Sequence, residues 1–117
     1  MTPEGKFKRK VLNALSESPF VGMIWVSETR RRRGHPDIMG LLTNGLFFAL
    51  EVKTANPFKK NGEAKAGRAR LQWASIKKIV RCGGVASFVF PENLEDTMVV
   101  LKAYAEKKVN LTLGENG

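Results

Sequence analysis

The sequence contains a single cysteine and a single histidine among its 117 residues. Within one chain, this excludes an internal disulfide and any zinc site built from several cysteines and histidines. No stretch approaches the roughly 18 apolar residues of a spanning helix, and the opening residues MTPEGKFKRK lack the apolar core of a signal peptide. We therefore expect an intracellular, cytoplasmic protein. We interpret Cys82 as a buried filler side chain before a turn.

Negative charge is scarce relative to positive charge. The chain carries 20 Lys and Arg against 11 Asp and Glu, a formal net charge of +9, so its natural partners are polyanions and above all nucleic acid. An anionic membrane fits less well, because no long helix pairs a basic face with an exposed aromatic face. The strands also lack the aromatic, glycine-spaced pattern of RNA-recognition sheets, which favours DNA as the partner.

The apolar pattern predicts one α/β domain with the element order α-β-β-β-α-β-α. A chain of this length with 43% hydrophobic residues can bury one core of its own. We expect residues 1–109 to form this domain and residues 110–117 to form a partly disordered tail. The expected elements span residues 3–18, 21–29, 37–54 (a hairpin), 69–82, 85–90 and 93–108.

The hairpin segment, DIMGLLTNGLFFALEVKT at residues 37–54, carries charges within a mostly apolar run. A three-residue turn with Gly45 in the left-handed conformation would place Asp37 opposite Glu51. A two-residue turn would instead put the two carboxylates on different faces. Under the three-residue register, strand alternation brings Lys53 to the face of both acids. This register predicts that two acids and a lysine converge at one edge of the sheet.

Two helical residues extend this group. Gln72 shares a helix face with the apolar Ile76, and Glu4 shares one with Phe7, so both polar side chains head a core-facing stripe. Other interpretations stay open. An amide at a helix end can bond to backbone or solvent, and an acid in a first helical turn is favoured by the helix dipole.

Paired carboxylates beside a lysine suit one kind of chemistry. Carboxylate oxygens bind Mg²⁺, which keeps several waters and accepts a substrate phosphate. The metal lowers the pKa of its water and offsets the charge that builds on the phosphate, while a lysine stabilises the transition state. These residues therefore suggest hydrolysis of a phosphodiester. The alternative is that Glu51 and Lys53 form a solvent-facing salt bridge, which is common on edge strands.

The order of these motifs resembles a known group of nucleases. HPD, thirteen further residues, EVK, a basic loop and then LQ at the start of a helix that runs to GG resemble the PD-(D/E)xK nuclease superfamily. Within it, the chain is most similar to the virus-type replication-repair nuclease (VRR-NUC) domain, whose stand-alone members are similar to Holliday junction resolvases. The resemblance covers roughly residues 1 to 105. It implies a restriction-endonuclease-like core, a mixed β-sheet flanked by helices, and a phage origin would fit it.

The resemblance also implies roles for individual residues. Asp37 and Glu51 would ligate Mg²⁺, for which Mn²⁺ would substitute, with the Val52 carbonyl as a further ligand. Lys53 would be the catalytic lysine, and Gln72 would complete the site from the following helix. Glu4 would contribute an acid from the first helix.

Two basic segments flank the candidate site in the sequence. The first consists of Arg30, Arg31, Arg32 and Arg33. The second is a loop that we expect to be mobile, together with the helix start after it, and its basic residues are Lys59, Lys60, Lys65, Arg68 and Arg70. We interpret both as contacts to the DNA backbone, although charge runs are often simply solvated. We interpret His35 as a loop residue rather than a catalytic base.

The expected function is that of a Mg²⁺-dependent, structure-selective DNA endonuclease on branched DNA such as four-way junctions, in replication, repair or recombination. A non-catalytic basic DNA-binding module is one alternative, and a nuclease for flaps, ends or single strands is another. Resolving a junction takes two symmetric cuts and the chain holds one candidate site, so we expect a homodimer. The helix side with Met98, Leu101 and Tyr104 either forms that interface or covers its own sheet. We expect no small-molecule cofactor and no membrane partner.

Overall fold

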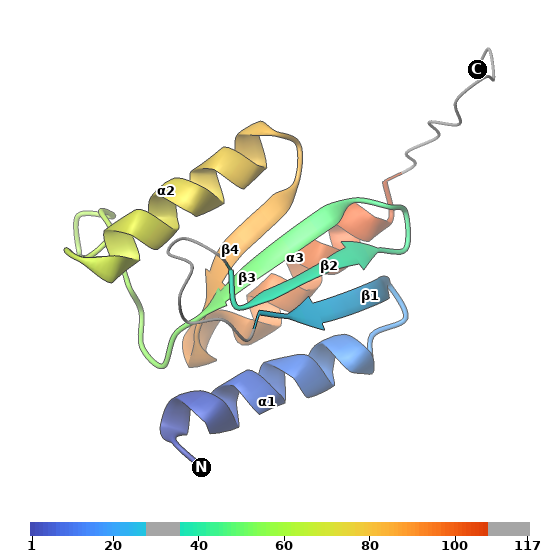
Figure 1. The fold of residues 1–117 in the computed structure, drawn as a ribbon. Helices are drawn as coiled ribbons and strands as arrows, with labels where there is room; N and C mark the ends of the chain where they lie inside the picture. The colour runs from blue at the N-terminus through green and yellow to red at the C-terminus, as the bar shows by residue number, and fades with distance from the viewer. Residues whose placement is uncertain (28–35, 108–117) are drawn as a thin grey trace.

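The computed structural model describes residues 1–27 and 36–107, so the tail expected over 110–117 lies outside the described residues. At its centre is a four-stranded sheet (Figure 1) in the order β1 (Val21–Val26), β2 (Ile38–Leu42), β3 (Phe47–Val52) and β4 (Val85–Val89). The first three strands are antiparallel neighbours, whereas β3 and β4 are parallel. A parallel pair needs a crossover connection, and this one includes a helix.

Three helices flank the sheet, and the predicted element order α-β-β-β-α-β-α is confirmed. They are α1 (Pro3–Ser16), α2 (Arg68–Arg81) and α3 (Leu94–Ala105), with a short 3-10 turn at Pro91–Asn93. Figure 1 shows α2 beside β4 and apart from α1. The first helix begins as its sequence predicts, because the Thr2 hydroxyl accepts a hydrogen bond of 3.0 Å from the Gly5 N–H.

The two faces of the sheet are covered differently. One face is covered by α1 and α3, whose buried Phe7, Val11 and Leu101 join Phe48 and Leu50 in the main core. The apolar side of α3 therefore covers its own sheet. This is the second of the two uses that the sequence left open for Leu101.

The opposite face is covered by α2. Ile76 of this helix packs with Phe88 and Phe90, and Trp73 and Phe58 lie against the same small cluster. The Phe58 and Trp73 rings meet edge to face with centroids 5.1 Å apart. Consequently, α2 is anchored over β4 and the neighbouring part of β3.

The hairpin between β2 and β3 has the predicted three-residue turn. Leu42 N–H donates to the Leu46 carbonyl at 2.9 Å, and Gly45 has a φ of 91°, where only glycine is free of strain. The ladder pairs Ile38 with Leu50, so the register continued by one residue places Asp37 opposite Glu51. Of the two registers considered, the structure therefore has the one in which the carboxylates meet.

The hairpin is also tied to the end of α3. The Asn44 side-chain amide donates to the carbonyls of Tyr104 and Lys107, both at 2.8 Å. These contacts satisfy carbonyls that a helix end otherwise leaves unpaired. The helix α3 ends at Ala105, earlier than the expected residue 108.

One expectation about the segments around α2 was wrong. Cys82 is exposed rather than buried, because it lies at the C-cap of α2, where the chain turns away through Gly83. The basic segment before α2 is a loop, as expected, and within it Phe58 and Ala64 form a β-bridge and the Lys59 N–H donates to the Glu63 carbonyl at 2.7 Å. Phe58 supplies an apolar anchor that the surrounding charge obscured in the sequence.

Across residues 1–27 and 36–107, no helix is both long enough and apolar enough to cross a membrane.

Candidate active site

The side chains of Asp37, Glu51 and Gln72 lie together at the end of the sheet where β2 begins and β3 ends. The Glu51 carboxylate accepts a hydrogen bond of 2.9 Å from the Gln72 amide nitrogen, and its side chain also contacts the Asp37 carboxyl. Glu51 and Gln72 are each only 5% exposed. The structure thus brings together the two acids from the hairpin and the amide from α2, as the sequence predicts.

Asp37 is held in place by the main chain. Its carboxylate accepts a hydrogen bond of 2.9 Å from the Val52 N–H, and its own carbonyl accepts one of 3.0 Å from the Ser27 N–H. The side chain at the start of β2 is therefore locked onto the end of β3. A ligand residue fixed in this way loses little conformational freedom on binding an ion.

Lys53 lies on the same side of the sheet as the acids. Its ammonium group stands 5.9 Å from the centroid of the Phe88 ring, and Phe88 is the β4 partner of Glu51 in the ladder. An aromatic face attracts a cation and limits where the amine can go. The lysine is thereby kept close to the acids instead of extending freely into solvent.

The environment of Glu51 strongly disfavours its charged form. Burial, the hydrogen bond to Asp37 and the negative charge of Asp37 raise the pKa of Glu51 from 4.5 to about 9, while Lys53 and Arg68 act in the opposite direction. Two carboxylates in contact cannot both ionise without a compensating cation. The protein alone therefore leaves negative charge at this position poorly compensated.

The Gln72 side-chain oxygen points to the same conclusion. It is buried and has no hydrogen-bond partner among the described residues, although the nitrogen of the same amide bonds to Glu51. An unsatisfied buried acceptor costs about 1–3 kcal/mol. The two carboxylates beside this amide form an oxygen donor set that fits a hard cation such as Mg²⁺.

Glu4 does not join this set. It is exposed on the first turn of α1, and no group of three or more acidic, histidine or cysteine side chains gathers within the described residues. The acidic part of the site thus consists of Asp37 and Glu51. The Val52 carbonyl remains a predicted ligand next to Glu51.

The basic residues predicted to bind DNA divide into two groups. The arginine run 30–33 and His35 lie outside the described residues, so their predicted roles stay predictions. The residues of the second group are all exposed, and they are Lys59, Lys60, Lys65, Arg68 and Arg70. Arg68 differs from the others because it opens α2 and its charge acts on Glu51. The structure therefore places it beside the acids.

The position of Phe88 beside the acids was not predicted from the sequence. The segment VASFVF indicates only an apolar strand, but parallel pairing with β3 sets Phe88 beside Glu51 and under the lysine amine. The parallel register could have been used as a signal, since a crossover helix after β3 returns the chain to the sheet beside it. No feature of Phe88 itself distinguishes it from a core residue.

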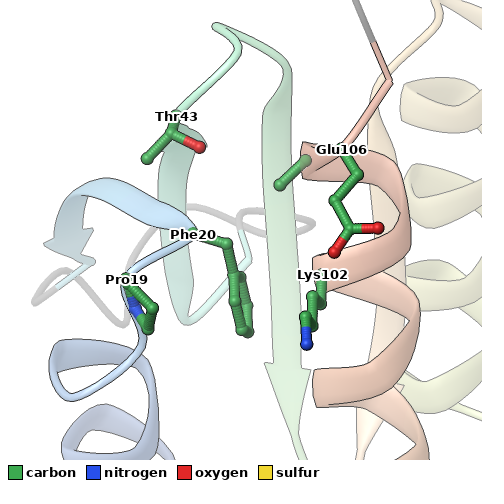
Figure 2. A pocket seen from close by; sticks show the side chains of 6 residues that line it. Pro19, Phe20, Thr43, Lys102 and Glu106 are labelled. Atoms are coloured by element: carbon green, nitrogen blue, oxygen red, sulfur yellow. The ribbon is translucent and has the colours of Figure 1, made fainter.

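The two main surface pockets of the described structure lie away from the acids. Figure 2 shows the first, of about 280 Å³, where Phe20, Thr43, Lys102 and Glu106 come together near the turn of the hairpin. That turn is at the opposite end of β2 from Asp37. The second, of about 360 Å³, lies between Phe47 and the last turns of α2. Neither pocket is lined by Asp37 or Glu51.

Searches of protein-family models, of curated proteins and of solved structures found no match to this chain. The functional interpretation therefore depends on the residues and their geometry.

Proposed function

We propose that this protein is a Mg²⁺-dependent deoxyribonuclease that hydrolyses phosphodiester bonds, with Asp37, Glu51, Lys53 and Gln72 as its active site. The contact of two carboxylates with each other, in a chain of net charge +9, is the observation that carries the proposal. Acidic side chains weaken the attraction of a protein for DNA. A pair of them held together in a basic protein is explained by a cation that binds between them and the phosphate.

Asp37 and Glu51 would hold the ion, and Gln72 supports Glu51 through its amide hydrogen bond. When bound, Mg²⁺ supplies an acidified water and charge neutralisation at the phosphate. Lys53 brings a positive charge to the same face, where it stabilises the charge that develops on the phosphate as the water oxygen–phosphorus bond forms and the ester bond breaks. Mn²⁺ would substitute, since it accepts the same oxygen ligands.

Branched DNA, such as a four-way junction, is the proposed substrate class, on the basis of the resemblance to junction-resolving nucleases. A junction requires two symmetric cuts, so the proposal includes a homodimer with one site per chain. Because Leu101 is buried in its own core, Tyr104 is the residue of the predicted α3 interface that stays exposed. A nuclease for flaps, ends or single strands would use the same site.

Cleavage assays with variants test the proposal. Labelled junction, flap, duplex and single-stranded DNA would be incubated with Mg²⁺, with Mn²⁺ or with EDTA. We expect Asp37→Ala, Glu51→Ala and Lys53→Ala to abolish cleavage, while both acid variants bind DNA in EDTA at least as well as the wild type. Glu63→Ala, at an exposed acid away from the site, is the matched control and should cleave normally.

Cleavage that survives in Glu51→Ala would refute the assignment. DNA binding that is the same with Mg²⁺ and EDTA, with no product from any substrate, would instead support the non-catalytic basic module.

A further inference from the structure

The face of the sheet that carries the acids also carries a partly exposed apolar strip, formed by Met23, Trp25, Met39, Leu41 and Phe47. The ladder pairs Trp25 with Met39, and Leu41 with both Met23 and Phe47, so their side chains point to one side. Met23 is 58% exposed and Trp25 is 39% exposed. The Trp25 and Phe47 rings lie with centroids 6.4 Å apart.

The strip is not what an outer strand ordinarily presents to water. A strand with one covered face alternates apolar and polar residues, but β1 has Met23 and Trp25 where polar residues are expected. Among the helices, α2 packs on this face mainly against β4 and β3. Within residues 1–27 and 36–107, the strip on β1 and β2 is left without a covering helix.

The strip leads directly to the acidic pair. On β2 the face runs from Asp37 to Met39 to Leu41, and on β3 from Glu51 to Ala49 to Phe47. Trp25 lies beside Met39, one step along the face from Asp37, which corresponds to about 7 Å of strand. A base next to a phosphate held at the acids is therefore within reach of the Trp25 ring.

At its far end, the strip meets the pocket lined by Phe47, Lys78, Ile79, Cys82 and Gly84. This pocket has a volume of about 360 Å³ and a largely apolar lining, with Lys78 as its charged residue. Aromatic surfaces for bases beside amines for phosphates are the two components of single-strand binding sites. A strand of nucleic acid brings negative charge to a chain of net charge +9, whereas a second copy of the chain does not, so nucleic acid is the better occupant of the strip.

We infer that the apolar strip is a stacking platform for unpaired nucleotides, with Trp25 and Phe47 receiving bases of the strand whose phosphate lies at Asp37 and Glu51. The inference rests on the proposed nuclease function and makes its substrate more specific. DNA with unpaired nucleotides beside the cut, such as a flap or an opened branch, is bound in preference to fully paired DNA.

The chain has two tryptophans, Trp25 and Trp73, which makes the platform directly observable. In the variant Trp73→Phe, the fluorescence reports on Trp25 alone. This protein would be titrated in EDTA with a short oligothymidylate and with an abasic strand of equal length and charge. We expect the oligothymidylate to quench the fluorescence and to bind roughly tenfold more tightly than the abasic strand. The two strands differ only in their bases, and stacking of a base on an aromatic side chain is sufficient for a difference of this size.

Variants then assign the preference to the strip, with binding followed by fluorescence anisotropy of labelled strands. Trp25→Ala should lose the preference for bases, and Trp25→Phe should keep most of it. Val99→Ala, at an exposed apolar residue on α3, is the matched control and should behave like the wild type. Thermal melting of each variant checks that the fold is retained.

Equal affinity for the two strands, or a preference that persists in Trp25→Ala, would overturn the platform. So would light scattering that shows a dimer in which Trp25 is shielded from acrylamide without DNA, because a second copy would then cover the strip. Since these measurements need no metal, their failure leaves the cleavage result of Glu51→Ala intact. Conversely, if binding depends on bases but no assay shows cleavage, the stacking platform would be supported and the proposed nuclease function would be refuted.

Discussion

Replacing Glu51 by glutamine should stabilise the metal-free protein near neutral pH. The folded-state pKa of about 9 lies above the ordinary value of 4.5, so between these values the folded protein holds a proton that the unfolded chain has released. The stability that this proton contributes is complete below about pH 4.5 and is lost as the pH rises towards 9. Glutamine removes the loss because it never ionises, and its oxygen can still accept the Gln72 hydrogen bond.

The size of this stabilisation follows from the coupling between protonation of Glu51 and folding. One unit of pKa difference corresponds to about 1.4 kcal/mol, which gives a limit of about 3 kcal/mol at pH 7. We therefore expect Glu51→Gln to raise the free energy of unfolding at pH 7 by about 1–3 kcal/mol. Urea denaturation in EDTA at pH 5, 7 and 8.5 measures it, and the gain should increase with pH.

In the presence of Mg²⁺, we expect the wild type to be more stable than Glu51→Gln. A cation that binds the folded state stabilises the wild type by mass action, whereas the variant has only one of the two carboxylate ligands. The reasoning would be refuted if the wild type were equally stable across this pH range in EDTA, or if Mg²⁺ stabilised Glu51→Gln as much as the wild type. Glu63→Gln, at an exposed acid, is the control for a general effect of charge.

Two further predictions concern the fold and the binding of DNA. Gly40→Ala should lower the free energy of unfolding by at least about 1–3 kcal/mol, because an added Cβ would lie 2.2 Å from the Met23 carbonyl oxygen and 2.5 Å from the Phe48 ring. Gly22→Ala, whose nearest contact would be 3.3 Å, should cost less in the same urea titration. Joint replacement of Arg31, Arg32 and Arg33 by alanine should flatten the salt dependence of DNA binding by roughly 0.9 for each phosphate that the arginines neutralise in the wild type. An unchanged slope would mean that the arginines do not bind phosphate.

The local parts of the fold were predictable because they depend on short-range rules. The cap at Thr2 follows from the chemistry of that residue, and the Asn44–Gly45 pair limited the hairpin to two registers, of which the structure has the one with the three-residue turn. The exposure of Cys82 and the anchoring of Phe58 were not predictable in the same way. Both depend on how α2 lies on the sheet, which no local pattern specifies.

The same distinction applies to the candidate site. Alternation along two paired strands predicts that Asp37, Glu51 and Lys53 lie together, and helical spacing adds Gln72. Glu4 has equally good spacing, but periodicity gives only the face of a helix. How far along the sheet a helix lies depends on packing between distant segments, and α1 does not bring Glu4 to the pair.

The energetic cost of the acidic pair distinguishes the proposed catalytic site from a surface that only binds DNA. A surface that binds DNA only by charge gains nothing from Asp37 and Glu51, which repel phosphate and, through the raised pKa of Glu51, cost stability at neutral pH. Neutral side chains of similar size would bind DNA better and fold more stably. Under the proposed function, a cation between the two carboxylates would make the pair favourable, and Lys53 on the same face would act on the phosphate bound to that cation. Destabilisation in EDTA, relief by Glu51→Gln and loss of cleavage in Glu51→Ala are therefore three consequences of one arrangement.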